Sequence, residues 1–437
     1  MNLFYDIEVY PFDAFVIFKD ENKNSKLFHD KNQFEGLADF IRGNTLVGYN
    51  NYWYDDHILD KMAKGWSAAQ LKELNDRIIG GEKIRGNYSF KSIDCFQQID
   101  VAMPGLKKIE GNMGKKILES SVPFDLPRPM KREEYKEAVD YCGYDVDMTI
   151  EVYKMREKNY FQVKQSLVDM IGKGDKWNTT TIAANVLLGN TSLPKWSDIR
   201  LSQDWTDFSM LNMVAPEVVE LWNSGKDKGK VTIDEFDNLI EFGFGGLHSV
   251  HKTQTRFKNV KLLDVKSMYP NIILIINALR EFSEKYKGIL DKRIAVKHID
   301  KLLSDALKLI LNSAYGNLNN QYSPLFNPKA ALSVCIYGQI SLYTLGKRLA
   351  EQGHTIVQLN TDGVAFVPGG ADYTDIWKQW EKDFSLELEE DSFDTFIQKD
   401  VNNYIGVKGE TVKSKGGDVG RYKSDSFFKN NSARIVD

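Results

Sequence analysis

Two short apolar runs joined through Asp362 and Gly363 constrain the C-terminal half of this chain more than any other feature. Residues 356–359 lead into the pair and residues 364–367 follow it directly. β-prone runs joined through Asp-Gly are typical of a β-hairpin. In most such hairpins the aspartate only stabilises the turn. Asp362 therefore takes part in chemistry only if the fold brings another carboxylate beside it.

The totals describe an ordinary soluble chain of 437 residues, with 42% apolar and 27% charged residues and a formal net charge of −4. That charge predicts no nucleic-acid partner by itself, so such a site would have to rest on local basic patches. Cys95, Cys142 and Cys335 are too widely spaced for a disulfide framework. The N-terminus has an acidic pair where a signal peptide needs basic residues, and no apolar run is long enough for a membrane. We therefore expect a cytoplasmic protein that is not secreted.

Periodicity predicts a mixed α/β organisation. Residues 1–60 alternate short β-rich runs with polar turns and a helical stretch near 33–42. Residues 132–158 have apolar side chains at helical spacing, whereas residues 159–235 give weak, mostly helical signals. Later segments predict a strand at 260–265, one or two helices over 289–316, helices from 331 and near 373–384, and a final β-rich stretch.

Asp264 is the first candidate partner for Asp362. It ends an apolar strand-like run and is followed by Pro270, which we expect to stop the strand. This places Asp264 at a strand end that faces a cleft. An isolated aspartate in this position is more often a cap than a catalytic group.

Between the two aspartates, cations recur at helical spacing. Lys308, Asn312 and Tyr315 form one stripe of a helix, and Arg293 and Lys297 form another just upstream. Two neighbouring cations repel slightly on a free helix. Their placement becomes favourable if the helix faces a polyanion such as a triphosphate. The alternative interpretation is a solvated charged face.

These pieces resemble, in order, the three polymerase motifs of family B DNA polymerases: SMYP after a strand-end aspartate, KxxxNSxYG, and a hairpin with TDG. The resemblance implies that Asp264 and Asp362 hold two divalent cations, Mg²⁺ with Mn²⁺ as the alternative. Such ions activate the primer 3′-hydroxyl and stabilise the leaving pyrophosphate. The hairpin of the family usually reads Asp-Thr-Asp, and this chain has Asn360 in place of the first aspartate. Met268 replaces the commoner leucine, a change that conserves volume.

The same resemblance implies a nucleotide site. Arg293, Lys297 and Lys308 would bind the triphosphate of the incoming dNTP, with Asn312 beside them. Tyr269 would exclude the ribose 2′-hydroxyl and Tyr315 would lie under the nascent base pair.

A second set of carboxylates lies in the N-terminal half. Asp6 and Glu8 are two residues apart on a predicted strand, so they share one face. Asp55 follows Asn50 and Asn51, and Tyr141 lies four residues before Asp145. With Asp6 and Glu8 these residues form the series DxE, N-x(3–4)-D and YxxxD. In this order the series resembles the three motifs of the family's 3′–5′ exonuclease. The resemblance implies a site with two metal ions, in which Tyr141 orients the attacking water.

Asn50 and Asn51 both fit the asparagine of the second exonuclease motif, which binds the DNA strand, and both stay open as candidates. For the other acids nearby we expect solvation or capping: Asp56, Asp94, Asp100 and Asp147.

Further matches concern DNA. Gly245 and Gly246 lie where the family has a Tyr-x-Gly-Gly loop for the template strand, although the tyrosine is missing here. Tyr404 and Lys415 resemble a region that grips the primer. For His248 and His251 we expect DNA contact or packing rather than metal ligation.

The fold class that the resemblance implies is a multidomain α/β protein. An RNase H-like exonuclease domain at 1–158 would precede a mainly helical linking region at 159–240. A right-hand palm at 241–275 and 325–437 would enclose short helical fingers at 276–324. The final residues resemble only the start of a thumb, which predicts a truncated or split enzyme.

The function implied is template-directed DNA synthesis with proofreading, as in phage replication. Its partners would be primer–template DNA, single-stranded 3′ ends and dNTPs, together with a processivity factor or a separate chain that carries a thumb. One alternative is a 3′–5′ exonuclease whose polymerase half holds DNA without extending it. A second alternative is a DNA-binding remnant without activity.

Overall fold

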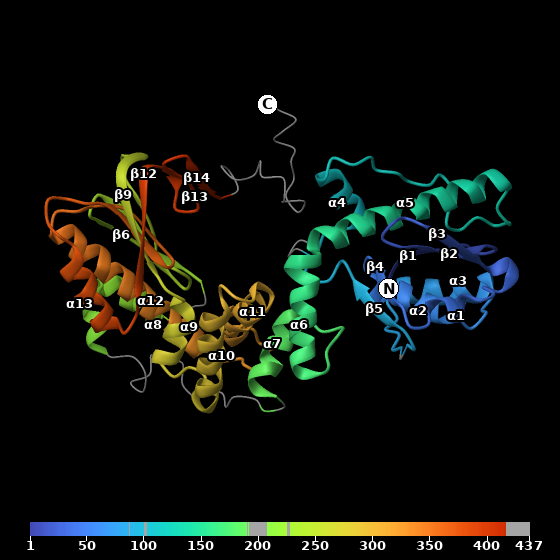
Figure 1. Cartoon of the computed structure of the whole chain (residues 1–437), viewed down its shortest axis with the longest axis horizontal. Coiled ribbons are helices and arrows are strands. Elements are labelled where there is room, and N and C mark those ends of the chain that lie inside the picture. The colour runs from blue at the N-terminus through green and yellow to red at the C-terminus, as the bar shows by residue number, and fades with distance from the viewer. Residues whose placement is uncertain (87, 100–102, 190, 192–207, 225–227, 417–437) are drawn as a thin grey trace. The chain divides into compact units, whose positions relative to one another are not determined.

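The computed structural model describes residues 1–86, 88–99, 103–189, 191, 208–224 and 228–416. They form two compact units, one of residues 1–168 and 172–178 and one that begins at 179 and also includes 169–171 (Figure 1). The tail expected to start a thumb, residues 417–437, lies outside the described residues, as does Asp100.

The first unit is a sheet between helices. Its elements are β1 (Asn2–Val9), β2 (Ala14–Lys19), β3 (Ser25–His29), α1 (Leu37–Ile41), β4 (Thr45–Gly48), α2 (Asp55–Met62), α3 (Ala68–Ile79), β5 (Lys91–Asp94), α4 (Leu106–Asn112) and α5 (Arg132–Arg156), followed by a π-helical turn (Glu157–Phe161) and α6 (Gln162–Ile171). The strand order is β3-β2-β1-β4-β5, with β1 antiparallel to β2 and parallel to β4.

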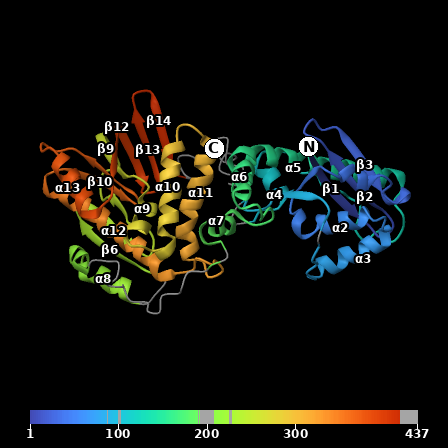
Figure 2. The same cartoon turned by 60° about the horizontal axis from the view of Figure 1, so that its bottom comes forward.

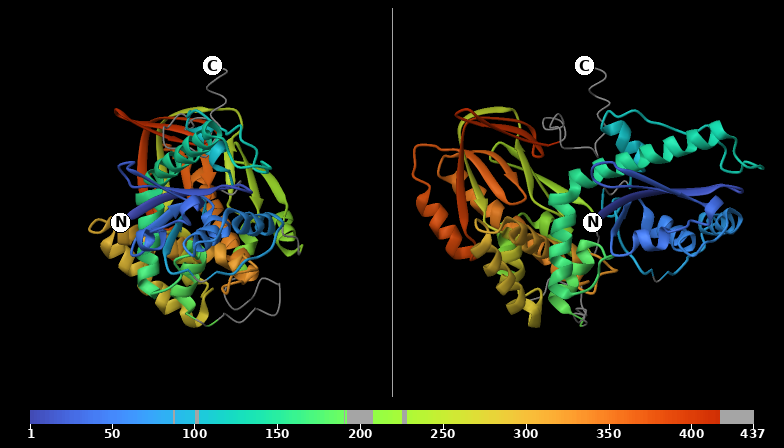
Figure 3. Two further views of the ribbon diagram at one scale, coloured as in Figure 1. Left: turned by 90° about the vertical axis from the view of Figure 1, so that its right-hand side faces the viewer. Right: turned by 45° about the vertical axis from the view of Figure 1, so that its right-hand side comes forward.

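Successive side chains of β1 point to opposite faces of the sheet and therefore pack against different helices. Leu3, Tyr5 and Ile7 pack into the core shared with α1, α2 and α3. Phe4 packs on the other face, into the core shared with α4 and α5. Figure 3 shows α5 along one face of this sheet and the shorter helices on the other. Because side chains alternate along a strand, Asp6 and Glu8 lie on the α5 face, as the sequence predicts.

The second unit combines a large sheet with helices. Its elements are α7 (Thr179–Leu188), α8 (Pro216–Asn223), β6 (Lys230–Glu235), β7 (Asn238–Gly243), β8 (His248–His251), β9 (Arg256–Val265), α9 (Met268–Ile275), α10 (Ser283–Val296), α11 (Lys301–Leu318), α12 (Pro328–Glu351), β10 (Thr355–Asn360), β11 (Gly363–Val367), α13 (Thr374–Phe384), β12 (Leu388–Asp400), β13 (Asn403–Lys408) and β14 (Thr411–Lys415).

Its strands form one antiparallel sheet in the order β14-β13-β12-β9-β11-β10-β8-β7-β6. The predicted hairpin is confirmed, since β10 pairs with β11 through Asn360 and Gly363. β9 lies between β11 and β12, so segments far apart in the sequence become neighbours. This order brings the ends of β9 and β11 together.

Helix α12 supports the sheet from one side. Its residues are mostly buried, and it contacts β10, β11, α9 and α13. Figure 2 shows α10 and α11 side by side, within the range expected for the fingers. The stretch 289–316 thus contains parts of two helices, with Asp300 as the N-cap of the second through its bond to the Leu303 N–H.

Residues 159–240, expected as a mainly helical linking region, are divided between the two units: most of α6 belongs to the first, whereas α7, α8 and β6 pack in the second. Two other expectations need correction. The helix expected near 33–42 is shortened to α1, since Gly36 adopts a left-handed conformation just before it. Pro270 lies within the first turn of α9 rather than ending β9, which stops at Val265; a missing N–H costs little there.

None of the helices in the described part of the chain combines the length and hydropathy that a membrane-spanning segment requires.

Candidate functional site

The sheet brings Asp264 and Asp362 together. Asp264 pairs with Gly363 across β9 and β11, and the Val265 N–H donates to the Asp362 carbonyl over 2.7 Å. A Cβ on Gly363 would lie 2.9 Å from Oδ1 of Asp264, too close for any side chain without a shift. Glycine at this position therefore lets the two strand ends approach and leaves room for the Asp264 carboxylate.

A third carboxylate, Glu389, lies beside this pair and was missed by sequence reasoning. It pairs with Asp264 from the other neighbouring strand, β12. Burial raises the pKa of Asp264 to about 6, and the negative charges of Asp362 and Glu389 add to this shift. The pKa remains raised although Lys413 and Lys415 counteract it. The three acids therefore form a centre with unbalanced negative charge.

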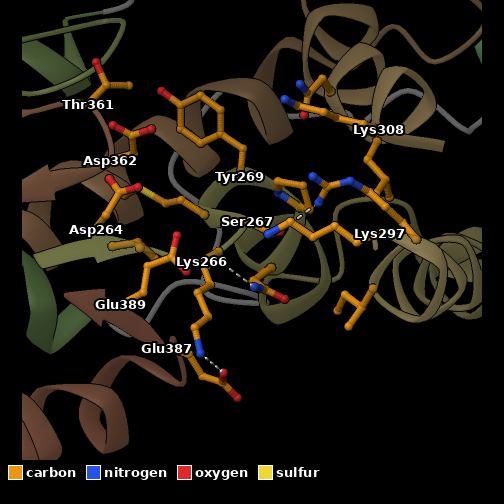
Figure 4. A pocket seen from close by; sticks show the side chains of 18 of the residues that line it. Asp264, Lys266, Ser267, Tyr269, Lys297, Lys308, Thr361, Asp362, Glu387 and Glu389 are labelled. Carbon is orange, nitrogen blue, oxygen red and sulfur yellow. Dashed lines mark hydrogen bonds and ion pairs between the residues drawn. The ribbon is translucent and has the colours of Figure 1, made fainter. Parts of the chain in front are cut away.

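These carboxylates line a cleft of about 1010 Å³. Figure 4 shows Asp264, Asp362 and Glu389 on one side and Lys297 and Lys308 on the other. The cleft is open to solvent and lined by polar groups from β9, the β10–β11 turn, α10, α11 and β12. It is large enough for a nucleotide-sized ligand.

The cations of this cleft lack acidic partners within the described residues. Arg293, Lys297 and Lys308 line it without an ion pair to any described carboxylate. Arg293 donates from Nη1 to Ser267 Oγ over 3.4 Å, and its buried Nε has no described acceptor. Asn312 also lines the cleft. Unpaired cations opposite clustered carboxylates are suited to a ligand that carries both phosphates and metal ions.

Two tyrosines stack at the cleft wall. The rings of Tyr269 and Tyr315 lie 4.7 Å apart at an interplanar angle of 27°. Tyr269 faces the cleft, whereas Tyr315 is not among the residues that line it. The Tyr315 hydroxyl lies 2.6 Å from Sγ of Cys335 on α12. Tyr315 therefore supports Tyr269 from behind in this arrangement.

The residues expected to contact DNA have different surroundings. Gly245 has open space beside it, and Gly246 lies against Thr361. Tyr404 is only 5% exposed and stacks on Phe396, with Lys415 near its ring. The ring of Tyr404 therefore belongs to the core of the sheet.

Both histidines are used within the protein. His248 Nε2 lies 3.2 Å from Thr361 Oγ1, and His251 Nδ1 accepts from the backbone N–H groups of Thr253 and Gln254. Neither histidine belongs to a metal-ligand cluster among the described residues.

The first unit contains a separate carboxylate cluster. Potential ligand atoms of Asp6, Glu8 and Cys142 all lie within 4.8 Å of one another. Burial raises the pKa of Asp6 to about 7, and the charge of Asp145 adds to the shift. The pKa of Glu8 is also raised, by burial and then by Asp6. Burial holds the pKa of the Cys142 thiol well above its usual range, so the thiol stays protonated and the ligand atoms that suit a hard cation are oxygens.

Helix α5 adds Asp145 and Tyr141 to this cluster. The raised pKa of Tyr141, due mainly to burial and then to Asp145, keeps its hydroxyl protonated, and this hydroxyl bonds to Asp145. Lys107 of α4 pairs with Asp145 and lies over the Tyr141 ring, 4.6 Å from its centroid. Glu110 is fully buried one turn further along α4 and contacts Lys107 through one oxygen, 3.5 Å away. Lys107 is thus a cation that reduces repulsion among these acids.

Asp55 begins α2 and is mostly buried. Burial raises its pKa, and Asp6 is the next cause, so the four expected carboxylates of this site influence one another. The neighbouring Asp56 has a different role from solvation or capping. It is fully buried and accepts bonds from Tyr5, Asn51, Ser92 and Lys176, which makes it part of the core.

The two asparagines are distinguished by these contacts. The Asn51 amide is buried and donates to Asp56 over 2.9 Å. Asn50 is exposed in a left-handed conformation, and only its backbone N–H is used, in a bond to Asp94. Asp94 thus caps this turn, as expected, and Asp147 pairs with Lys19.

Comparison with known proteins gives a sequence relationship. An alignment of 234 positions, which covers 46% of this chain, shows 29% identity to DNA polymerase 1 of Saccharolobus solfataricus. The match covers 26% of that protein, so the chain spans about a quarter of the relative that it matches. This part of the chain is homologous to a DNA polymerase. No protein-family model matches the sequence.

A solved structure is also similar. It is the family B DNA polymerase of the hyperthermophilic archaeon Pyrobaculum calidifontis, which aligns with 95% of this chain and 60% of its own at a TM-score of 0.47 and 16% identity.

Sequence reasoning missed two residues of these sites, because their local pattern indicates a strand or a charged helix face but not a place in a site. Glu389 lies in an alternating stretch that suits a strand, but nothing in one sequence reveals that β12 pairs with β9. Lys107 lies in a basic helical stretch between two exonuclease-like motifs, where a charged surface is the usual interpretation.

Proposed function

We propose that the chain is a DNA polymerase of the family B type, which extends a primer with dNTPs on a template and removes 3′ nucleotides at a second site. The observation that carries the proposal is the cleft in which Arg293, Lys297 and Lys308, without acidic partners in the described residues, face Asp264 and Asp362. Homology to a DNA polymerase over 46% of the chain favours DNA as the substrate.

The donor set at the cleft fits Mg²⁺, with Mn²⁺ as an alternative. Asp264, Asp362 and Glu389 supply only oxygen atoms. Burial and, after it, the negative charges of Asp362 and Glu389 raise the pKa of Asp264, and a bound cation would neutralise those charges. Asp264 and Asp362 would hold the ions, and Glu389 would complete the acidic wall. When bound, two such ions supply Lewis-acid stabilisation of the charge that develops on the attacking and leaving oxygens.

The protein's own groups orient the nucleotide. Arg293, Lys297 and Lys308 bind the triphosphate, because several fixed cations outcompete water for a polyanion. Tyr269, held by its stack on Tyr315, forms a flat wall where the sugar lies and excludes a ribose 2′-hydroxyl. Asn360 removes one charge from the hairpin relative to the family and bonds to the Val401 carbonyl instead.

In the first unit, Asp6, Glu8, Asp55 and Asp145 would hold the metal ions of the exonuclease, again through oxygen atoms. Tyr141 donates to Asp145 and is placed to orient the attacking water. Asn50 is the better candidate for contact with the DNA strand, because its exposed side chain is free of Asp56 whereas that of Asn51 is not. On this proposal the first unit is an RNase H-like exonuclease, and the second contains palm and fingers.

Several finer points stay predictions from sequence: a role in phage replication, a processivity factor, and a separate chain carrying the thumb. The described residues end at 416, so they do not test the last of these.

The experiment is a gel assay with a 5′-labelled primer annealed to a longer template, in Mg²⁺, with and without dNTPs. The proposal predicts extension with dNTPs and shortening without them. Shortening in both lanes would contradict polymerase activity and favour the exonuclease alternative. An unchanged primer in both lanes would contradict both activities.

A further inference from the structure

The turn that leads from the end of β7 towards β8, residues 243–246, contains three glycines and Phe244. It borders a shallow hollow of about 360 Å³, and it touches Thr361, which precedes Asp362. A Cβ on Gly246 would lie 2.7 Å from Oγ1 of Thr361, so glycine is required for this approach. Within the described residues the N–H groups of Gly245 and Gly246 have no hydrogen-bond acceptor. Such N–H groups suit the phosphates of a nucleic-acid strand.

A glycine-rich turn is conformationally free unless other groups hold it. Here Gln339 of α12, only 1% exposed, holds it with its whole amide. Nε2 donates to the carbonyls of Gly243 and Gly245, each over 3.0 Å, and Oε1 accepts from the Gly243 N–H over 3.1 Å. Two acceptors and one donor on the turn match the two N–H groups and the oxygen of a single amide.

The face of α12 that carries Gln339 also contacts the stacked tyrosines at the wall of the carboxylate cleft. One helical turn before Gln339, Sγ of Cys335 lies 3.6 Å from the Phe244 carbonyl and 2.6 Å from the Tyr315 hydroxyl. Tyr315 stacks on Tyr269 at the cleft. Helix α12 therefore contacts the glycine turn and the tyrosine pair through residues four apart, which lie on one face.

We propose that Gln339 is a positioning residue that fixes the shape of the 243–246 turn and thereby sets the affinity for the template strand. The proposal rests on the proposed polymerase function and names a residue outside the carboxylate and nucleotide sites. Trp222 Nε1 also donates to the Gly243 carbonyl over 3.2 Å, so loss of the three Gln339 bonds frees the turn mainly at Gly245. Ordering this part of the turn on DNA then costs binding free energy.

Two substitutions separate the amide from its volume. Gln339→Met keeps a similar size but removes all three bonds. Gln339→Glu keeps the acceptor for the Gly243 N–H but, when ionised, directs a carboxylate at two carbonyls; when protonated, it donates to one of them. Tyr337→Phe is the matched control, since it removes one buried bond of the same helix, from the Tyr337 hydroxyl to the Phe384 carbonyl over 2.9 Å, on the face towards α13.

The readouts are fluorescence anisotropy for template–primer binding, single-nucleotide extension, and degradation of single-stranded DNA by the other unit. For Gln339→Met we expect the Kd for template–primer to rise about tenfold, as loss of several hydrogen bonds that fix one turn implies. The KM for dNTP and the exonuclease rate should stay unchanged. Tyr337→Phe should bind DNA like the unaltered chain.

Gln339→Glu distinguishes a positioning role from a purely structural one through the pH dependence of DNA affinity. Its deficit in DNA affinity, relative to the unaltered chain at the same pH, should shrink as pH falls from 8 to 6 and the carboxyl gains its proton. This variant also serves if Gln339→Met does not fold.

Unchanged template–primer affinity in Gln339→Met, or equal loss of binding and exonuclease activity, would overturn the inference. So would a deficit of Gln339→Glu that does not vary with pH. If the unaltered chain extends a primer and Gln339→Met matches it, only this inference fails. If the unaltered chain neither binds nor extends template–primer, the proposed function fails and the inference falls with it.

Discussion

Asp264 and Glu389 lie directly opposite each other on the neighbouring strands β9 and β12. Like charges in this position repel. Burial is the main reason for the raised pKa of Asp264, and the charges of Asp362 and then Glu389 add to it. A sheet keeps such a pair only at a cost in stability, which a bound cation removes. The pair therefore links the architecture of the second unit to its proposed chemistry.

Glu389→Gln should lower primer extension by roughly tenfold or more, in line with the loss of one preorganised charge at a reaction centre. It should also raise the Mg²⁺ concentration needed for half-maximal rate. Extension measured over a Mg²⁺ series checks this. Glu387→Gln is the control, because Glu387 lines the same cleft but pairs with Lys266 over 3.3 Å. Equal effects of both substitutions would contradict a special role for Glu389.

Lys308→Met should raise the KM for dNTP by about tenfold or more and leave template–primer affinity unchanged, because it removes one charge-assisted contact to the triphosphate. Steady-state extension with varied dNTP gives this KM. Lys292→Met, at an exposed position of α10 outside the cleft, should have the KM of the unaltered chain. A raised KM in both variants would instead indicate a general charge effect.

Substitution of Asn51 should affect the stability of the first unit, whereas substitution of Asn50 should affect the degradation of DNA. Asn51→Ala leaves the buried Asp56 without one donor and should destabilise the first unit by about 1–3 kcal/mol. Asn50→Gly, which keeps the left-handed conformation accessible, should leave the melting temperature nearly unchanged and slow the degradation of single-stranded DNA. Thermal melting and the exonuclease assay on both variants test this assignment, and the opposite pattern would reverse it.

Without divalent cations, the first unit should lose stability as pH rises from about 4 to about 7. The reason is that the folded pKa of Asp6, about 7, lies above its usual value of 3.8. Folding then favours the protonated form, so the stabilisation is complete below the unfolded pKa and is lost as pH rises through the folded one. Glu8, Asp55 and Asp145 shift in the same direction.

Hydrogen exchange of β1 and α5 in EDTA across this pH range measures the effect. Asp6→Asn should reduce the dependence on pH, and Mg²⁺ should protect these elements more at pH 8 than at pH 5. Exchange that slows as pH rises, once corrected for intrinsic rates, would contradict the account.

The sequence predicted local structure where periodicity and turn chemistry agree. The hairpin at Asp362 and the long helix after Arg132 are both present, because Asp-Gly turns and regular apolar spacing act over a few residues. The sharing of one strand face by Asp6 and Glu8 follows from the same short-range geometry.

What could not be predicted depends on contacts between distant segments. Glu389 joins Asp264 only through the pairing of β12 with β9, and Gln339 meets the glycine turn only because α12 packs beneath it. The division of 159–240 between the units likewise reflects packing, since its weak periodicity carries no information about which core each helix joins. The stack of Tyr404 on Phe396 likewise depends on the pairing of β13 with β12.

Asp264→Asn and Asp6→Asn, compared on one labelled template–primer, test most directly whether each unit has its own carboxylate site and its own reaction. We expect Asp264→Asn to abolish extension and leave shortening intact, and Asp6→Asn to abolish shortening and leave extension intact. If Asp264→Asn extends the primer like the unaltered chain, or if either substitution removes both activities from a folded protein, the assignment of two independent sites is wrong.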